Sequence, residues 1–187
     1  MRLDGKKIHL QPLKEKDLPT LHHYLYGEEQ PEWKKWDAPY FEHKQIDYET
    51  FYQKNIQTIQ ETKPNRLGIF TGNQLIGTVG FYWEHEPSRW LEAGITIFDP
   101  NYWNGGYGTE ALSLWVDYIF QQYEVARVGI TTWSGNHRMM KAAEKIGMIL
   151  EGRMRKCRYY NGEYYDSIRM GVLREEWQSN KIPNNTK

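Results

Sequence analysis

The chain has 187 residues, with 24 Lys+Arg against 24 Asp+Glu and a formal net charge of zero. This length is typical of one domain with a sizeable core, and the balanced charge argues against nucleic acid or a membrane surface as partner. The single cysteine, Cys157, excludes an internal disulfide, and we find neither an apolar leader nor an apolar run of about 18 residues. We expect a cytoplasmic protein with one domain over residues 1–178 and a polar tail over residues 179–187.

Apolar periodicity predicts the elements of the first half of the chain. Gly72-Asn73 joins two strands as a tight hairpin turn, and Asp17 stands at the start of the first helix, with Pro19 in its first turn. The predicted elements are a strand at 7–13, helices at 16–26 and 41–62, and hairpin strands at 66–71 and 74–83.

The second half alternates strands with helices. The predicted elements are a strand at 89–98, a glycine-rich turn at 104–109 that leads into an amphipathic helix, a strand at 125–133, a helix at 136–146, and strands at 154–160 and 164–173. Hairpin strands followed by an alternating half predict an α+β (α/β layered) protein with a mixed central sheet.

Three glycines, Gly105, Gly106 and Gly108, stand between an apolar strand and the amphipathic helix. They permit a tight turn and a close backbone approach to a ligand, and the following helix N-terminus offers free N–H groups and a positive dipole end. Thr109 and Glu110 stand where a P-loop needs Lys and Ser/Thr, and the turn comes too late in the chain for a dinucleotide fingerprint. The pattern therefore predicts a pyrophosphate site of another kind.

Residues 28–40, here called the lip segment, mix aromatic rings with carboxylates. Aromatic faces and carboxylates both attract cations, so the segment is a candidate amine-binding lip. The alternative is a solvated loop whose tryptophans cover the core. The aromatic residues are Trp33, Trp36 and Tyr40, and the acidic residues are Glu28, Glu29, Glu32 and Asp37.

Two blocks of sequence resemble a known family. Residues 99–111, which contain Gly106 and Gly108, resemble motif A of the GNAT superfamily of acetyl-CoA-dependent N-acetyltransferases, written Gln/Arg-x-x-Gly-x-Gly/Ala. Trp103 replaces the usual Gln/Arg, as in the branch of ribosomal-protein N-terminal acetyltransferases and spermidine acetyltransferases. Residues 136–148 resemble the segment that follows in the family. The resemblance covers most of residues 7–173.

The resemblance implies the GNAT fold, with a sheet of about seven strands, helices on both faces, and strands 89–98 and 125–133 splayed around acetyl-CoA. Arg138 or Lys141 would meet a phosphate of the nucleotide end, or else lie on a solvated face. The residues implied to hold the cofactor are Ile95, Thr96 and Ile97 at the pantetheine arm, Trp103, Asn104, Gly105, Gly106, Tyr107, Gly108 and Thr109 at the pyrophosphate, and Asn136.

Acetyl transfer to an amine needs a proton acceptor, because an amine of pKa about 10 is protonated at neutral pH. Glu92 resembles the strand glutamate that is the base in several GNAT enzymes. The alternative is a structural carboxylate, and Glu84, His85 and Glu86 are rivals. The tyrosine that protonates the leaving thiolate in many relatives is replaced by Ala143, so the general acid would be Ser134 or one of the tyrosines Tyr159, Tyr160, Tyr164 and Tyr165.

Three functions remain open from the sequence. The first is acetylation of a small-molecule primary amine, such as a polyamine or aminoglycoside. The second is acetylation of a protein N-terminus, and the third is a catalytically weak acetyl-CoA sensor. No metal site is expected because the six histidines are scattered, and a homodimer is an open expectation. The candidate acceptor-binding residues are Trp33, Trp36, Asp37, Tyr40, Trp83 and Tyr159.

Overall fold

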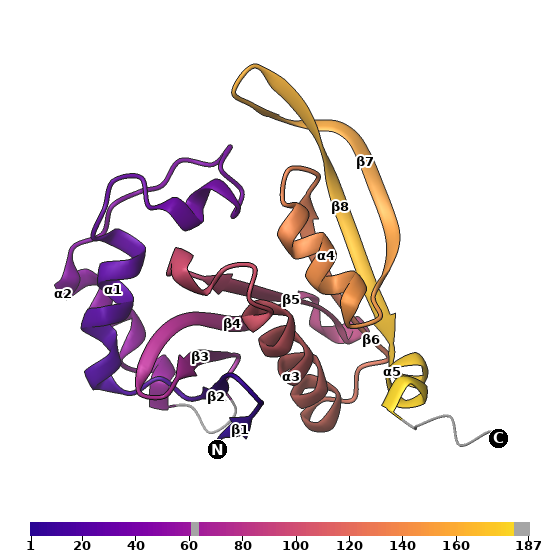
Figure 1. Cartoon of the computed structure of the whole chain (residues 1–187), viewed down its shortest axis with the longest axis horizontal. Helices are drawn as coiled ribbons and strands as arrows, with labels where there is room; N and C mark the ends of the chain where they lie inside the picture. The colour runs from indigo at the N-terminus through magenta and orange to yellow at the C-terminus, as the bar shows by residue number, and fades with distance from the viewer. Residues whose placement is uncertain (61–63, 182–187) are drawn as a thin grey trace.

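The computed structural model describes residues 1–60 and 64–181 (Figure 1). The strands are β1 (Leu3–Asp4), β2 (His9–Gln11), β3 (Arg66–Thr71), β4 (Gln74–His85), β5 (Trp90–Ile97), β6 (Arg127–Trp133), β7 (Ile149–Tyr160) and β8 (Glu163–Leu173). The α-helices are α1 (Leu18–Tyr26), α2 (Tyr48–Asn55), α3 (Tyr107–Gln122), α4 (His137–Lys145) and α5 (Arg174–Lys181). The 3-10 turns are η1 (Glu15–Asp17), η2 (Glu32–Lys35), η3 (Thr58–Gln60), η4 (Glu86–Ser88) and η5 (Pro100–Tyr102).

All eight strands belong to one sheet in the order β1-β2-β3-β4-β5-β6-β8-β7. Only β5 and β6 are parallel neighbours, and every other pair is antiparallel. The prediction of a mixed sheet of about seven strands is confirmed, with β1 as a short additional edge strand. The hairpin at Gly72-Asn73 is also confirmed, because β3 and β4 pair from Arg66↔Gly80 to Thr71↔Gln74.

Helices cover both faces of the sheet because successive strand residues point to opposite sides. Ile69 packs in the core cluster that contains α3, whereas the next residue, Phe70, packs in a second cluster with Leu18 and Leu21 of α1. The sheet therefore has α3 and α4 on one face and α1 and α2 on the other.

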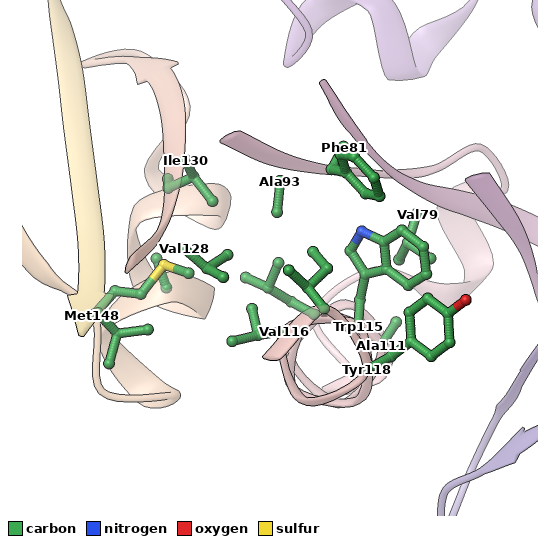
Figure 2. Packing of buried hydrophobic residues seen from close by; sticks show 14 of the residues in the cluster. Val79, Phe81, Ala93, Ala111, Trp115, Val116, Tyr118, Val128, Ile130 and Met148 are labelled. Carbon is green, nitrogen blue, oxygen red and sulfur yellow. The ribbon is translucent and has the colours of Figure 1, made fainter. Parts of the chain in front are cut away.

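Trp115 anchors α3 to the sheet (Figure 2). Its side chain is fully buried, its ring stacks on Phe81 with centroids 6.0 Å apart, and its Nε1 donates to the Gly80 carbonyl at 2.8 Å. Burial of a tryptophan of this size contributes a few kcal/mol. This packing fixes where the N-terminus of α3 lies relative to β4 and β5.

Several elements differ from the sequence prediction: β7 begins at Ile149 rather than at 154, β2 covers only part of the strand expected over 7–13, and two helices differ more. The helix expected over 41–62 begins only at Tyr48, because Asp47 caps it by accepting from Thr50 N at 2.9 Å, and it ends at Asn55. Residues 61 and 62 of that expected helix lie outside the described residues. Helix α5 was not expected, and it crosses the proposed boundary between residues 178 and 179, while residues 182–187 of the expected tail also lie outside the described residues.

Arg174, at the start of α5, explains why this helix packs on the domain. Its guanidinium donates to the carbonyl oxygens of Phe120 at 2.7 Å, Tyr123 at 2.6 Å and Val125 at 2.9 Å. These carbonyls lie at and beyond the C-terminus of α3, where a cation is favoured. Arg174 therefore joins α5 to the end of α3. The residues next to Arg174 in the sequence did not indicate this contact.

Candidate active site

The strands β5 and β6 part partway along their length. They pair only at Leu91↔Val128 and Glu92↔Gly129, whereas β6 stays paired with β8 as far as Trp133. Beyond Glu92, β5 has a free edge toward β6, and Ile95, Thr96 and Ile97 on it are only half-buried. This gap in the sheet is the splay that the family resemblance implied.

A cavity of about 320 Å³ lies beside this free edge. It brings together the β5 residues, the glycine-rich turn, the start of α4 and part of the lip segment. Gly105 and Tyr107 belong to the turn but do not line the cavity. The lining residues are Trp33, Trp36, Asp37, Ile95, Thr96, Ile97, Tyr102, Trp103, Asn104, Gly106, Gly108, Thr109, Asn136, His137, Arg138, Met139, Lys141, Ala142 and Lys145.

The glycine-rich turn has the backbone that its sequence requires. Asn104 and Gly106 adopt left-handed conformations, with φ of 60° and 83°, and Gly106 is the N-cap of α3 without a side-chain cap. The first intrahelical hydrogen bond runs from Glu110 N to the Gly106 carbonyl. The preceding N–H groups of this 16-residue helix are therefore available to an anion at its positive end.

The N-terminal segment holds this turn in place. Lys7 Nζ donates to the Gly105 carbonyl at 2.6 Å and lies 5.5 Å from the centroid of the Tyr107 ring. The Glu110 carboxylate accepts from the backbone N of Lys6 and, at 3.1 Å, of Lys7. The sequence analysis missed Lys7, because about a hundred residues separate it from the turn and no local pattern links them.

Arg138 lies between two indole rings. Its Cζ is 4.3 Å from the ring centroid of Trp36 in the lip segment and 4.3 Å from that of Trp103 in the turn. Arg138 Nη1 and Trp36 Nε1 are buried and have no hydrogen-bond partner among the described residues. These contacts favour the phosphate alternative for the half-buried Arg138 over the solvated face.

Asn136 ties the lip segment to α4. Its Oδ1 caps the helix by accepting from Met139 N at 3.0 Å, and its Nδ2 donates to the Trp36 carbonyl at 2.9 Å. Trp133 Nε1 donates to the same carbonyl at 2.9 Å. Asn136 thus lines the cavity, as expected, and both ends of its amide are already engaged within the protein.

Glu92 is fully buried where β5 and β6 part. Its Oε1 accepts from Arg127 Nη1 at 3.0 Å and from Trp90 Nε1 at 3.0 Å, and its Oε2 accepts from Thr131 Oγ1 at 3.3 Å. A second guanidinium, that of Arg169, lies 3.5 Å from Oε1. This carboxylate does not line the cavity, and its partners favour the structural alternative over the base.

Arg127 joins Glu92 to Glu151. Its Nε donates to Glu151 Oε2 at 2.8 Å. Burial alone lowers the pKa of Arg127, but the hydrogen bond to Glu151 and the negative charge of Glu92 raise it overall. Tyr82, which the sequence analysis did not single out, pairs with Glu92 across β4 and β5 and is 52% exposed, and its partial burial raises its pKa. Tyr82 is thus a partly exposed side chain on the Glu92 face of the sheet.

The other catalytic candidates are not brought to the cavity. His85 is exposed, and its Nδ1 lies 2.7 Å from Ser88 Oγ. Ser134 Oγ accepts from Asp166 N at 2.9 Å, which staples the end of β6 to β8. Ala143 is fully buried in the main core. The structure therefore does not gather Glu92, His85 and Ser134 into one site.

The candidate acceptor residues divide into two groups. Trp33, Trp36 and Asp37 line the cavity, although Trp33 is largely buried and its Nε1 donates to the Tyr24 carbonyl at 2.8 Å. Trp33 therefore covers the core, as the second alternative for the lip segment expects, whereas Trp36 and Asp37 remain candidates for binding an amine. Tyr40 packs edge-on against Trp133, with centroids 6.0 Å apart, near the cavity wall.

Two candidates lie elsewhere. Trp83 packs against Phe81 and Tyr123 at centroid distances of 5.8 and 6.0 Å, in the core cluster of α3. Tyr159 is exposed near the tip of the β7–β8 hairpin, with its ring 5.0 Å from that of Tyr164. Successive residues of a strand point to opposite faces of the sheet, and this alternation directs Trp83 of β4 and Tyr159 of β7 away from the cavity.

The cavity fits coenzyme A by its own donors. The cavity is bordered by the N-terminus of α3 with Gly106 at its N-cap, by Arg138 with its unpartnered Nη1, and by Lys141 and Lys145. Such donors suit phosphate oxygens. In residues 1–60 and 64–181, no helix is long and apolar enough to cross a membrane, and no three His, Cys, Asp or Glu side chains cluster as metal ligands would.

Known proteins are similar to this chain in sequence and in fold. Residues 7–149 match the family model of the acetyltransferase (GNAT) domain. The uncharacterized N-acetyltransferase YoaA of Bacillus subtilis is 31% identical over 118 residues, which cover 60% of this chain and 66% of that protein. The putative ribosomal N-acetyltransferase YdaF of the same organism is 28% identical over 114 residues, covering 61% and 62%. The chain thus spans just under two thirds of each of these curated relatives.

A solved structure agrees with the fold. Spermidine N-acetyltransferase from Vibrio cholerae, in complex with CoA and spermine, superposes with a TM-score of 0.76 at 19% identity over 93% of this chain and 99% of that one. At this identity the match speaks for the fold, whereas the family model covers most of the chain. With its splayed sheet and its glycine-rich turn at the N-terminus of α3, the chain belongs to the GNAT acetyltransferase domain family.

Proposed function

We propose that this protein transfers the acetyl group of acetyl-CoA to a primary amine. The observation that carries the proposal is the cavity at the splay, which joins the free edge of β5 to the glycine-rich turn at the N-terminus of α3. The free edge offers main-chain groups to an extended arm, and the helix N-terminus offers N–H groups to a pyrophosphate. Bound acetyl-CoA supplies the activated acetyl thioester, and the remaining roles belong to the chain.

The residues proposed to hold the cofactor are those of the sequence analysis that border the cavity. Ile95, Thr96 and Ile97 would bind the arm through their main chain. The pyrophosphate would be bound by the turn residues Trp103, Asn104, Gly106, Gly108 and Thr109. Asn136 would contribute indirectly, because its amide holds the Trp36 carbonyl and the first turn of α4. The lip segment is then positioned against the cofactor site by a residue of that same site.

We propose that Glu92 acts through the charge network rather than by touching the amine. Its carboxylate is buried and accepts from Arg127, Trp90 and Thr131. A base needs a lone pair directed at the proton or at a water chain, and those of Glu92 point to these donors. Proton removal would then use a water chain along the Glu92 face of the sheet, where Tyr82 is accessible.

A strong general acid is not required for the departing thiol. A thiol of pKa about 8.5 is a tolerable leaving group without protonation in the transition state. The buried Ala143 therefore does not argue against turnover. We propose a direct attack of the neutral amine on the thioester, in which binding and orientation supply most of the rate enhancement.

The leading acceptor is a small molecule with a primary amine, such as a polyamine or an aminoglycoside. Asp37 lines the cavity, and its carboxylate would favour the cation of an amine acceptor. The Vibrio cholerae spermidine enzyme with the same fold was solved with spermine, which supports this class without identifying the acceptor.

A protein N-terminus is the second candidate, and Arg158 favours it. The Arg158 guanidinium lies 5.0 Å from the Tyr40 ring centroid, between the lip segment and the β7–β8 hairpin, and its Nε is buried without a partner in the described parts of the chain. An arginine there repels a polyamine but can donate to peptide carbonyl or carboxylate oxygens. The YdaF relative is described as a putative ribosomal N-acetyltransferase.

A thiol-release assay with acetyl-CoA tests the proposal. The acceptors are spermidine, an aminoglycoside, free amino acids and peptides with free N-termini, and CoA binding is followed in parallel by calorimetry. Turnover on one class establishes the reaction and its acceptor. Tight CoA binding without turnover on any class would favour the sensor alternative, and no CoA binding would refute the assignment of the cavity.

A further inference from the structure

Arg138 is the point at which three separate parts of the cleft meet. It stands on α4, Trp36 belongs to the lip segment, and Trp103 belongs to the glycine-rich turn. Both indole centroids are 4.3 Å from its Cζ, and the two rings are 6.4 Å apart at 83° to each other. Contact with two rings that stand nearly perpendicular restricts the guanidinium, whereas a solvated arginine samples many rotamers.

Each ring of this stack is itself held in place. Trp103 Nε1 donates to the Ile97 carbonyl of β5 at 2.9 Å. The Trp36 carbonyl accepts from Asn136 Nδ2 and from Trp133 Nε1, both at 2.9 Å. The stack therefore links the lip segment to β5, β6 and α4 at one position beside the cavity.

The guanidinium has an unused capacity to donate. Arg138 Nη1 is buried without a hydrogen-bond partner, and no carboxylate forms an ion pair with Arg138 among the residues that the structure describes. Lys141 and Lys145 border the same cavity. Arg138 as a whole is half-buried, but a buried N–H group without an acceptor is costly, so Nη1 calls for an anionic ligand in this cavity.

We propose that Arg138 is a positioning residue through which binding of the cofactor phosphates orders the lip segment. The inference rests on the proposed function and extends it: a phosphate of CoA accepts from the free N–H groups of Arg138, and the fixed guanidinium then holds Trp36. The lip segment carries the candidate acceptor-binding residues Trp36, Asp37 and Tyr40. The acceptor site is consequently complete only after the cofactor has bound.

Sequence reasoning could not reach this inference. Trp103 replaces the Gln/Arg that begins motif A in most relatives, and the structure shows a guanidinium from α4 packed on that same indole. Trp103 and Arg138 are 35 positions apart, so no local pattern links the indole to the guanidinium that packs on it.

Hydrogen exchange of the full-length protein tests the coupling. Peptides over residues 28–40 are followed alone and with saturating CoA, with 3′,5′-ADP, which has phosphates but no arm, and with pantetheine, which has the arm but no phosphate. We expect protection by CoA and by 3′,5′-ADP and none by pantetheine. The lip segment has little regular structure of its own, so its exchange reports its attachment.

Four variants separate the roles of the stack. In Arg138→Ala we expect about tenfold weaker CoA binding by calorimetry, about 1.4 kcal/mol, and no protection of residues 28–40 at saturating CoA. Arg138→Lys keeps the charge but not the planar fork, so it should retain more affinity and still lose protection. Trp36→Leu should lose protection with less than about a threefold change in affinity. Arg89→Ala, which removes an exposed arginine paired with Glu124, is the matched control and should behave as wild type.

The outcomes distinguish this inference from the proposed function. If wild type binds CoA and releases thiol, but Arg138→Ala binds CoA equally well or its lip segment is equally protected, the coupling is wrong and the enzyme assignment stands. The same holds if CoA does not protect the lip segment of wild type. If wild type binds no CoA, both proposals fail. Thermal unfolding of each variant identifies a folding defect. If Arg138→Ala is unfolded, the protection of residues 28–40 in Arg138→Lys tests the coupling instead.

Discussion

The Arg127 guanidinium donates to the buried Glu92 carboxylate at 3.0 Å, at the residue pair where β5 and β6 cease to be neighbours. Glu92 has no solvent exposure, and Arg127 is 22% exposed. A charge network therefore closes the sheet where its backbone ladder ends. The cavity begins just beyond that network.

Glu92→Gln should lower the free energy of unfolding by about 3 kcal/mol, because it removes the fully buried charge that Arg127 and Arg169 share and leaves Arg127 paired with Glu151 alone. Chemical denaturation measures the change. Glu124→Gln removes the carboxylate of an exposed pair with Arg89 and should cost less than about 1 kcal/mol. Equal effects of the two substitutions would contradict the structural role of Glu92.

The pH–rate profile separates positioning from base catalysis at the same residue. If Glu92 acts through its network, Glu92→Gln lowers kcat but keeps the acidic limb of the kcat/KM profile. If Glu92 were the base, its ionisation would define the acidic limb. Loss of that limb in Glu92→Gln would therefore identify Glu92 as the proton acceptor.

Gly106→Ala should weaken CoA binding by at least about tenfold. The residue has φ of 83°, where a Cβ costs about 1–2 kcal/mol, and it is the N-cap of α3 in the cavity wall. Gly72→Ala is the matched control, because Gly72 also has a positive φ, of 54°, but lies in the distant β3–β4 turn. It should lose similar stability and bind CoA normally. A parallel loss of affinity in both variants would mean that global stability, rather than the turn, was being measured.

Ser134→Ala and His85→Ala should differ in what they disturb. Ser134 Oγ accepts from the backbone N of the buried Asp166, so its removal should cost about 1–2 kcal/mol of stability. His85 is exposed, and its removal should change stability by less than about 0.5 kcal/mol. We expect kcat within about twofold of wild type for His85→Ala. A large loss of kcat in His85→Ala would instead identify His85 as a base in the reaction.

Stability should fall as the pH drops below about 6.5, in part through His9. Burial chiefly, and then the charge of Arg2, lower the pKa of His9 in the folded protein. The unfolded chain therefore takes up the proton first, and the contribution of His9 is present above the unfolded pKa and lost below it. His9→Phe keeps a ring against Phe70, whose centroid is 5.5 Å away. Denaturation midpoints at pH 5.5 and 7.5 should differ less in His9→Phe than in wild type, and an unchanged difference would exclude His9 as a contributor.

Local patterns were sufficient to predict most of the scaffold. The glycine-rich turn, the start of α3 and the hairpin at Gly72-Asn73 depend on residues adjacent in the chain, and the structure has each where it was expected. The helix expected at 41–62 was too long because aromatic spacing alone could not reveal the Asp47 cap. Helix α5 was missed because its contacts depend on Arg174 reaching carbonyls about fifty residues away.

Neighbouring residues alone were enough to indicate the family, the hairpin of β3 and β4, and the glycine-rich turn. What individual side chains do depended on contacts between distant parts of the chain. The tertiary structure buried Glu92 among Arg127, Arg169 and Trp90, and stacked Arg138 between Trp36 and Trp103. The reason is physical: a turn or a helix start is a preference of a few consecutive residues, whereas a buried charge is settled by whichever donors and rings the folded sheet brings to it.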